Sequence, residues 1–288
     1  MPEPLGLLQV HAHPDDEASK GSGVTARYHD EGVHTVLVCC TGGEAGDILN
    51  PAMERPEVLE HLLEIRMEEL AESARILGYD AVHLLGYHDS GMPDTETNAR
   101  PDNFANAPFD EAVGRLVAII RAERPQVIIT YGDERGYPHP DHLRVHEITG
   151  PAFDAAGDPA KYPDAGPAWQ PRKLYETGWS RQRVEALGAA HEKLGQENPF
   201  ARWFEREDFG DYDDKVTTKV DVGNYLRQRR EALLAHRTQV DPNGFWMQLP
   251  DEVVREAWPW EEYALVRSLV PEPRSDDGYE DDLFAGLR

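Results

Sequence analysis

Short apolar runs alternate with longer segments of helical spacing through the first half of the chain, and this alternation constrains the fold most strongly. The runs predicted to be strands cover residues 5–12, 33–41, 80–86 and 125–131. The segments predicted to be helices cover residues 20–31, 56–77, 108–123 and 142–156. Strands joined by helix-length crossovers form parallel sheets. The sequence therefore predicts an α/β fold with a Rossmann-like, mostly parallel sheet covered by helices on both faces.

The second half of the chain is less regular. We predict one more strand at residues 173–179 and helices at residues 181–194 and 222–236, after a loop at 157–171 that is rich in Pro, Gly and Asp. No clear domain boundary interrupts the 288 residues. We therefore expect a single domain, with a Rossmann-like core at about 1–156, a substrate-side portion at about 157–270 and an acidic tail at about 271–288.

The charge of the chain excludes several classes of partner. Its 54 Asp and Glu residues outnumber its 29 Lys and Arg residues, which gives a formal net charge of −25. Such a surface repels phosphate backbones and anionic bilayers, so neither nucleic acid nor membrane is expected as a partner. The two cysteines, Cys39 and Cys40, are adjacent on a predicted strand and point to opposite faces, so they do not pair. With no signal peptide visible, we expect a cytoplasmic protein.

Two segments dense in His and Asp follow predicted strands. His-Ala-His-Pro-Asp-Asp-Glu occupies residues 11–17 after the first strand, and Tyr-Pro-His-Pro-Asp-His occupies residues 137–142 after the fourth. Because the carboxyl ends of parallel strands meet at one edge of the sheet, we expect these segments to lie together. A single Asp there is most often a helix cap and a single His a loop residue, but two such clusters at matching strand ends favour a site.

The residue types in these clusters suit a metal. His13 and Asp16 share one face if the chain becomes helical after Pro14, and His142 is the best candidate for a third ligand. Two imidazoles and one carboxylate leave an open position for water on Zn²⁺, as in catalytic zinc sites. Iron(II) accepts the same set, so the ligands leave both metals open.

The remaining polar groups of the clusters suit hydrolysis. Asp15 is beside the metal without being a ligand and is predicted to accept a proton from the attacking water. His139 is predicted to stabilise the oxyanion or to protonate the leaving amine. Asp141 is predicted to hold His139 in the required tautomer, and Tyr137 to add a phenol donor to the oxyanion.

These motifs resemble the LmbE-like family of zinc-dependent de-N-acetylases that act on glucosamine derivatives. The resemblance extends over the whole chain, and it implies the same roles for the ligands and for Asp15, His139, Asp141 and Tyr137. It further implies that Glu44, Arg66 and Asp89 bind sugar and inositol hydroxyls. Lys20, which is also predicted to bind substrate, matches a residue that marks the amidase branch of the family. Each of three residues also has an interpretation without a role in binding. Arg66 could be a charge on a helix surface, Asp89 a turn residue and Lys20 a solvated charge.

The amidase branch acts on thiol conjugates of mycothiol. The resemblance thus implies a small-molecule substrate in which an S-substituted N-acetylcysteine is amide-linked to glucosaminyl-inositol. Two alternatives remain: a deacetylase of N-acetylglucosaminyl-inositol, and a metal- or sugar-binding protein without activity. Side chains that could bury the interface of a homo-oligomer are Trp258, Trp260, Leu283 and Phe284.

Overall fold

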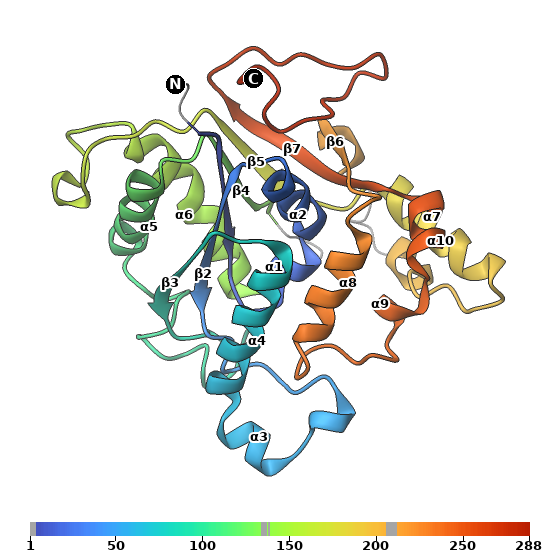
Figure 1. Ribbon diagram of the computed structural model, residues 1–288. Coiled ribbons are helices and arrows are strands. Elements are labelled where there is room, and N and C mark those ends of the chain that lie inside the picture. The colour runs from blue at the N-terminus through green and yellow to red at the C-terminus, as the bar shows by residue number, and fades with distance from the viewer. Residues whose placement is uncertain (1–3, 134–136, 138, 206–211) are drawn as a thin grey trace.

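The computed structural model describes residues 4–133, 137, 139–205 and 212–288. Its centre is a seven-stranded sheet with the order β3-β2-β1-β4-β5-β7-β6 (Figure 1). The strands are β1 (Gly6–His11), β2 (His34–Thr41), β3 (Ala81–Tyr87), β4 (Val127–Tyr131), β5 (Lys173–Thr177), β6 (Thr218–Asp221) and β7 (Trp260–Ser268). Strands from both halves of the chain therefore share one sheet.

Neighbouring strands from β3 to β5 are parallel, as the sequence predicts. β7 pairs antiparallel with β5 and with β6, and neither β6 nor β7 is among the predicted strands. The apolar pattern of β7 is interrupted by Glu261 and Glu262, which are nevertheless buried. Backbone N–H groups and a serine hydroxyl bond these carboxylates from elsewhere in the chain, so a local pattern does not reveal the strand.

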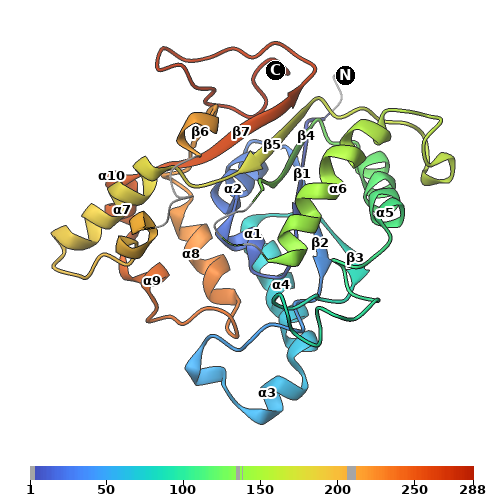
Figure 2. The same cartoon turned by 180° about the vertical axis from the view of Figure 1, so that it is seen from behind.

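Helices cover both faces of the sheet, which confirms the predicted fold class. α5 (Phe109–Glu123) and α6 (Pro140–Ala156) lie on one face, and α2 (Ser22–Asp30) and α4 (Leu62–Leu77) lie on the other (Figures 1 and 2). Consecutive residues of β1 enter separate clusters, since Leu8 packs with α5 and α6 while Leu7 packs with α2. Cys39 and Cys40 likewise point to opposite faces and are both unpaired, as predicted.

The single helix predicted over residues 56–77 is wrong. The segment forms a short α3 (Pro56–Glu60) and the longer α4, and His61 between them leaves the helical region with φ −115° and ψ 24°. Leu62 and Leu70 are buried, whereas Leu59 on α3 is 63% exposed. α3 extends away from the body of the molecule (Figure 1), so its leucine has no core to pack against.

The second half adds a layer of shorter helices beside the antiparallel strands. These are α7 (Arg181–Lys193), α8 (Leu226–Ala235), α9 (Phe245–Gln248) and α10 (Asp251–Ala257). α7 and α8 match predictions to within a few residues, whereas α9 and α10 are not predicted. Within the described part of the chain, no helix combines the length and the apolar character needed to cross a bilayer.

The end of the chain packs onto the sheet. Residues 271–278 are exposed, but Leu283 and Phe284 are fully buried, and the Phe284 ring meets Tyr28 edge to face at 5.0 Å. Glu280 accepts a hydrogen bond from the buried Lys173 ammonium at 2.6 Å. Because both apolar side chains are covered by their own chain, they do not offer a surface to a second copy.

Replacing Phe284 with Ala should therefore destabilise the whole fold. We expect the free energy of unfolding to fall by about 3–5 kcal/mol, because a buried aromatic ring is lost. Urea denaturation followed by circular dichroism measures this change. Leu269, which is 54% exposed, provides the control, and L269A should change stability by less than about 0.5 kcal/mol. Equal effects of the two substitutions would contradict the docking of the chain end.

Candidate metal centre and active site

The two His/Asp clusters meet at the carboxyl ends of β1 and β4. These strands are adjacent and parallel, with Leu7 opposite Val127 and Leu8 opposite Ile128. The chain after β1 enters the short helix α1 (Asp16–Ser19), and the segment after β4 enters α6. The rings of His13 and His142 come within 5.4 Å between centroids, which confirms that the clusters converge.

Three buried side chains place ligand atoms around one point. Nδ1 of His13 lies 3.5 Å from Oδ2 of Asp16, and Nε2 of His142 lies 3.3 Å from the same oxygen. The three atoms lie within 4.8 Å of one another. Two ligands that each lie 2.0–2.1 Å from a tetrahedral ion are about 3.3–3.4 Å apart. The two measured separations match this value, so the residues present fit a metal ion.

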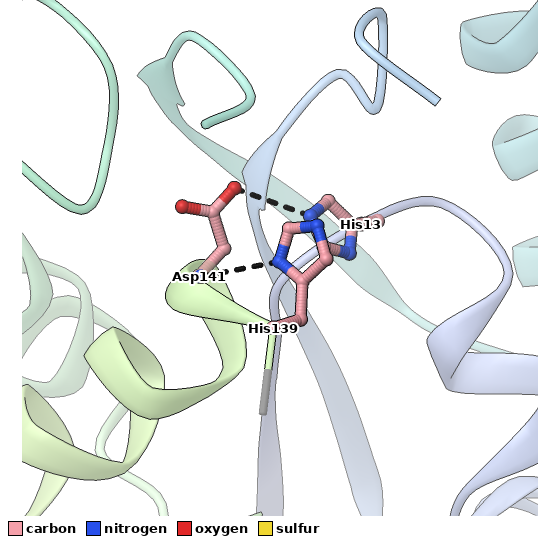
Figure 3. Close-up of side chains that lie close together, drawn as sticks. All are labelled: His13, His139 and Asp141. Atoms are coloured by element: carbon pink, nitrogen blue, oxygen red, sulfur yellow. Dashed lines mark hydrogen bonds and ion pairs between the residues drawn. The ribbon is translucent and has the colours of Figure 1, made fainter. Parts of the chain in front are cut away.

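The second nitrogen of His13 is held by Asp141. Nε2 of the ring donates to Oδ2 of Asp141 at 3.2 Å, as Figure 3 shows. The Asp141 carboxylate is fully buried and also accepts from the backbone N–H and the hydroxyl of Ser90. With Nε2 carrying hydrogen, the lone pair of Nδ1 is free to face Asp16 and His142. Such a carboxylate–histidine pair fixes the tautomer of a metal ligand and makes it more basic.

The field at His13 favours a positive charge. Burial alone lowers its pKa, but the hydrogen bonds to Asp141 and Asp16 and the charge of Asp89 raise the pKa of His13 to about 10. Burial raises the pKa of Asp16, but the charges of His142 and Lys20 hold it well below its usual value. Groups that bind a proton this tightly also favour a metal cation at the same point.

A second set of groups, His13, His139 and Asp141, also brings one ligand atom each within 4.8 Å (Figure 3). In this set the two carboxylate oxygens of Asp141 already accept hydrogen bonds from Ser90 and His13. In the first set, Oδ1 of Asp16 is bound by Lys20 at 2.8 Å, and Oδ2 faces both imidazole nitrogens. The first set is therefore the better metal site.

Asp15 is held in an unusual backbone conformation beside this site. Its φ of 106° is in a region that costs a residue with a side chain about 1–3 kcal/mol. Its N–H donates to Oε2 of Glu17 at 2.9 Å, and its carboxylate accepts from Nη2 of Arg66 at 2.9 Å. Burial raises the pKa of Asp15, against the charge of Arg66. A carboxylate whose pKa is raised toward 7 is a more effective general base at neutral pH.

Glu17 supports this conformation, although the sequence assigns it no role. Its fully buried carboxylate accepts from the N–H of Asp15, from the hydroxyl of Ser73 at 2.5 Å and from Nε2 of His236 at 2.6 Å. In the sequence, the feature that points to Glu17 is its position in the first His/Asp cluster. His236 lies just after α8, more than 200 residues away, and no local pattern connects it to the site.

His139 and Tyr137 lie against the ligand histidines, with ring centroids 4.5 Å apart for His139 and His13 and 5.2 Å apart for Tyr137 and His142. Nδ1 of His139 accepts the backbone N–H of Asp141 at 3.2 Å, so its hydrogen is on Nε2 (Figure 3). The tautomer is thus set by the main chain of Asp141, whereas the predicted carboxylate contact is made to His13 instead. Burial, followed by the charge of His13, lowers the pKa of His139 to about 4, so the ring is neutral at pH 7. The Tyr137 ring is 6.0 Å from His139 and half exposed.

Lys20 and Arg66, two of the four predicted substrate-binding residues, contact the cluster directly. Lys20 pairs with Asp16, and its ammonium lies 5.3 Å from the centre of the Tyr131 ring. The Arg66 guanidinium is buried and donates to Asp15 and to the carbonyls of Pro14 and Gly43. These contacts connect both cations to the carboxylates of the first cluster.

Asp89 lies beside His13, and Glu44 accepts the backbone N–H of Asp89. Oε1 of Glu44 lies 2.9 Å from Nδ1 of His88, while its Oε2 is buried and has no partner among the described residues. Asp89 accepts from the N–H groups of Gly91 and Ala45, and its Oδ1 is 3.7 Å from Nε2 of His13. The structure thus brings all four predicted residues near the metal cluster.

Residues 8–153 match the family model described as "PIG-L: GlcNAc-PI de-N-acetylase". The chain belongs to this family. A full-length relative from Streptomyces coelicolor, named mycothiol S-conjugate amidase, is 44% identical over 100% of this chain and 99% of its own length. A relative from Geodermatophilus obscurus, named 1D-myo-inositol 2-acetamido-2-deoxy-alpha-D-glucopyranoside deacetylase, is 41% identical over 98% of this chain and 97% of its own.

The fold is also that of a deacetylase whose structure has been solved. The N,N'-diacetylchitobiose deacetylase from Pyrococcus horikoshii superposes with a TM-score of 0.62 at 18% identity, covering 92% of this chain and 85% of that one. The family and the relatives make the chain a hydrolase of amide bonds, and the LmbE-like deacetylases are metal-dependent. The family predicted from the two motifs is confirmed.

The contact between Asp141 and His13 predicts that the charge of Asp141 strengthens metal binding. D141N keeps one acceptor for Ser90 but removes the charge that makes His13 basic, so we expect metal affinity to fall about 10–100-fold. Competition for zinc with a chromophoric chelator measures this change. D110N on the exposed first turn of α5 is the control and should bind metal as the unmodified protein does. Undiminished affinity in D141N would refute the role of Asp141.

Proposed function

We propose that this chain is a zinc-dependent amidohydrolase that cleaves the amide between glucosamine and the acylcysteine of mycothiol S-conjugates. The products are a mercapturic acid and glucosaminyl-inositol, which suits a cytoplasmic enzyme that detoxifies electrophiles or tailors a thiol adduct. The assignment of this substrate is supported by the match over the whole chain to the relative named mycothiol S-conjugate amidase.

His13 Nδ1, Asp16 Oδ2 and His142 Nε2 would hold the metal. Two nitrogens and one oxygen at tetrahedral separations support Zn²⁺, and iron(II) remains the alternative for this ligand set. A bound zinc ion supplies Lewis acidity to the amide carbonyl and makes the attacking water more acidic.

Asp15 takes the proton from the attacking water. Its carboxylate is not among the three ligands, it is partly exposed, and its pKa is raised by burial. Arg66 binds Oδ2 of the same carboxylate and keeps the group oriented, while Glu17 holds its strained main chain. Asp15 therefore acts as the general base from a fixed position.

Nε2 of His139 donates its hydrogen to the oxyanion that forms at the amide carbon. The neutral ring and the main-chain contact on Nδ1 support this role as donor. The Tyr137 phenol adds a second donor from the rim of the site. Asp141 acts by orienting His13. Proton delivery to the glucosamine nitrogen then releases the amine, with the proton that Asp15 accepted as its source.

Four further residues would bind the substrate outside the reacting bond. Glu44 and Asp89 are the acceptors for sugar and inositol hydroxyls, and the unpartnered Oε2 of Glu44 supports this assignment. Arg66 and Lys20 are the donors, and Lys20 is placed beside the ligand Asp16. Glu44, Asp89 and Arg66 would bind the polyol half of the substrate, which the amidase and deacetylase substrates share, whereas Lys20 would serve the amidase alone.

A deacetylase of N-acetylglucosaminyl-inositol is the second candidate, and the 41% identical relative favours it. The two reactions share the metal, the base and the sugar, and they differ only in the acyl group. A non-catalytic binding protein is disfavoured, since a strained, non-ligand carboxylate beside the metal has no value for binding alone.

Turnover of two substrates separates the two enzyme candidates. Protein stripped of metal and reloaded with zinc should hydrolyse a bimane conjugate of mycothiol with a higher kcat/KM than N-acetylglucosaminyl-inositol. Metal-free protein provides the baseline for both reactions. A clear preference for acetate release would replace the amidase proposal with the deacetylase.

Replacing Asp15 with Asn tests the base. D15N keeps the size of the side chain and the ligand set, so zinc content should stay at one ion per chain while kcat falls about 10²–10⁴-fold. Activity and metal content are measured on the same sample. D94N, at an exposed turn residue with positive φ, is the matched control and should retain activity. Near-normal turnover in zinc-loaded D15N would refute this mechanism.

A further inference from the structure

A pocket in the second half of the chain is lined by several aromatic side chains together with Leu, Val and two Arg residues. It lies among α7, α8, α9 and α10 and encloses about 560 Å³ of empty space, open solvent included. We call it the aromatic pocket, and the residues that matter here are Trp179, Arg183, Arg229, Trp246, Trp258 and Glu261. Pockets that bind small molecules usually combine apolar walls with a few polar groups.

The aromatic pocket lies at the same edge of the sheet as the metal cluster but uses different residues. Thr177, the last residue of β5, pairs with Tyr131 at the end of β4, and Trp179 follows two residues later. None of its lining residues belongs to the ligand set or to the predicted substrate residues. It is therefore a separate recess beside the site.

Arg183 is buried in this recess without a counter-charge in contact. It is 9% exposed, and its guanidinium lies over the Trp179 ring at 3.9 Å from the centroid. Its Nε is buried with no hydrogen-bond partner. Among the described residues, none accepts a hydrogen bond from this guanidinium or forms an ion pair with it. Burial of an unpaired cation is costly unless a ligand supplies the missing charge.

Arg229 brings a second unpaired cation to the same walls. Burial, followed by the charge of Arg183, lowers the pKa of Arg229 to about 10, so it stays charged at neutral pH. The other two arginines of α8 have acidic partners: Arg227 contacts Glu231 at 3.0 Å and Arg230 contacts Asp251 at 2.7 Å. No such partner for Arg229 occurs in the part of the chain that the structure describes.

The acids whose charges act on Arg183 are already engaged. Glu261 accepts the N–H groups of Gly23 and Val24 at 3.0 Å each. Glu262 accepts from the backbone and the hydroxyl of Ser180. In a chain with a net charge of −25, two arginines in one recess that form no ion pair with any described residue therefore stand out as a local site for an anion.

We infer that the aromatic pocket binds an organic carboxylate that carries an aromatic or similarly flat apolar group. Guanidinium groups bind a carboxylate through paired N–H donors, and the indole and phenyl rings accept the apolar body. The indole N–H of Trp258 is buried and has no hydrogen-bond partner in the described parts of the chain, so it is a further donor. The acid released by the proposed amidase reaction belongs to this chemical class, but the inference stands on the pocket alone.

Calorimetric titration with 2-naphthoate tests this inference. The zinc-loaded protein should bind one naphthoate per chain with a Kd below 1 mM, and 2-naphthylmethanol, which has the same rings without the charge, should bind at least about tenfold more weakly. A carboxylate can also bind zinc directly, so the titration is repeated after zinc is removed. Unchanged affinity without zinc supports the aromatic pocket, and loss of binding would place the ligand on the metal and overturn the inference.

Substitution of the arginines locates the bound anion. R229M removes the charge while keeping the length of the side chain and should weaken naphthoate binding at least about tenfold, with little effect on the alcohol. R227M is the matched control on the same helix, where the side chain is 79% exposed, and should bind as the unmodified protein does. R183M provides a second test if it folds normally by circular dichroism. Equal binding of the acid and the alcohol, or naphthoate affinity unchanged in R229M, would overturn the inference.

Discussion

Negative charge concentrated around one imidazole determines what this site must hold. Carboxylates of Asp16, Asp89 and Asp141 all lie within 3.7 Å of a His13 ring nitrogen and are almost completely buried. Burying charges of one sign is strongly unfavourable unless a cation offsets them. The Lys20 ammonium neutralises part of the charge of Asp16 from outside the cluster. The remaining negative charge requires either a proton on His13 or a metal ion among the ligands. The electrostatics therefore favour a cation at the same point that the ligand types indicate.

The position of Asp15, the proposed general base, depends on contacts from both halves of the chain. Asp15 adopts its positive φ because Glu17 accepts its N–H, and Glu17 is in turn bonded to Ser73 on α4 and to His236 after α8. α8 packs on α1, so the helix layer of the second half supports the catalytic turn directly. Strain at Asp15 is therefore stabilised by a buried polar network that closes only in the complete fold.

The sequence predicts the parts of this protein that depend on local pattern and parallel topology. Strand–helix alternation predicts the first four strands, and the convergence of parallel strands at their carboxyl ends predicts that His13, Asp16 and His142 lie together. Contacts between distant segments are not predicted, because nothing local marks them. Glu261 and Glu262 conceal β7 by interrupting its apolar pattern, and His61 divides a helix whose leucines appear continuous in sequence. The interaction of His236 with Glu17 is of the same long-range kind.

The charges around the site also affect how strongly each product is retained there. Cleavage of the amide converts a neutral acyl group into a carboxylate next to Asp15, Asp89 and Asp141, and like charges at close range disfavour its retention there. The amine product gains a proton and is instead attracted to these acids and to Glu44. The nearby recess with Arg183 and Arg229 has the opposite preference. An acid product and an amine product are therefore attracted to different groups once the bond between them is broken.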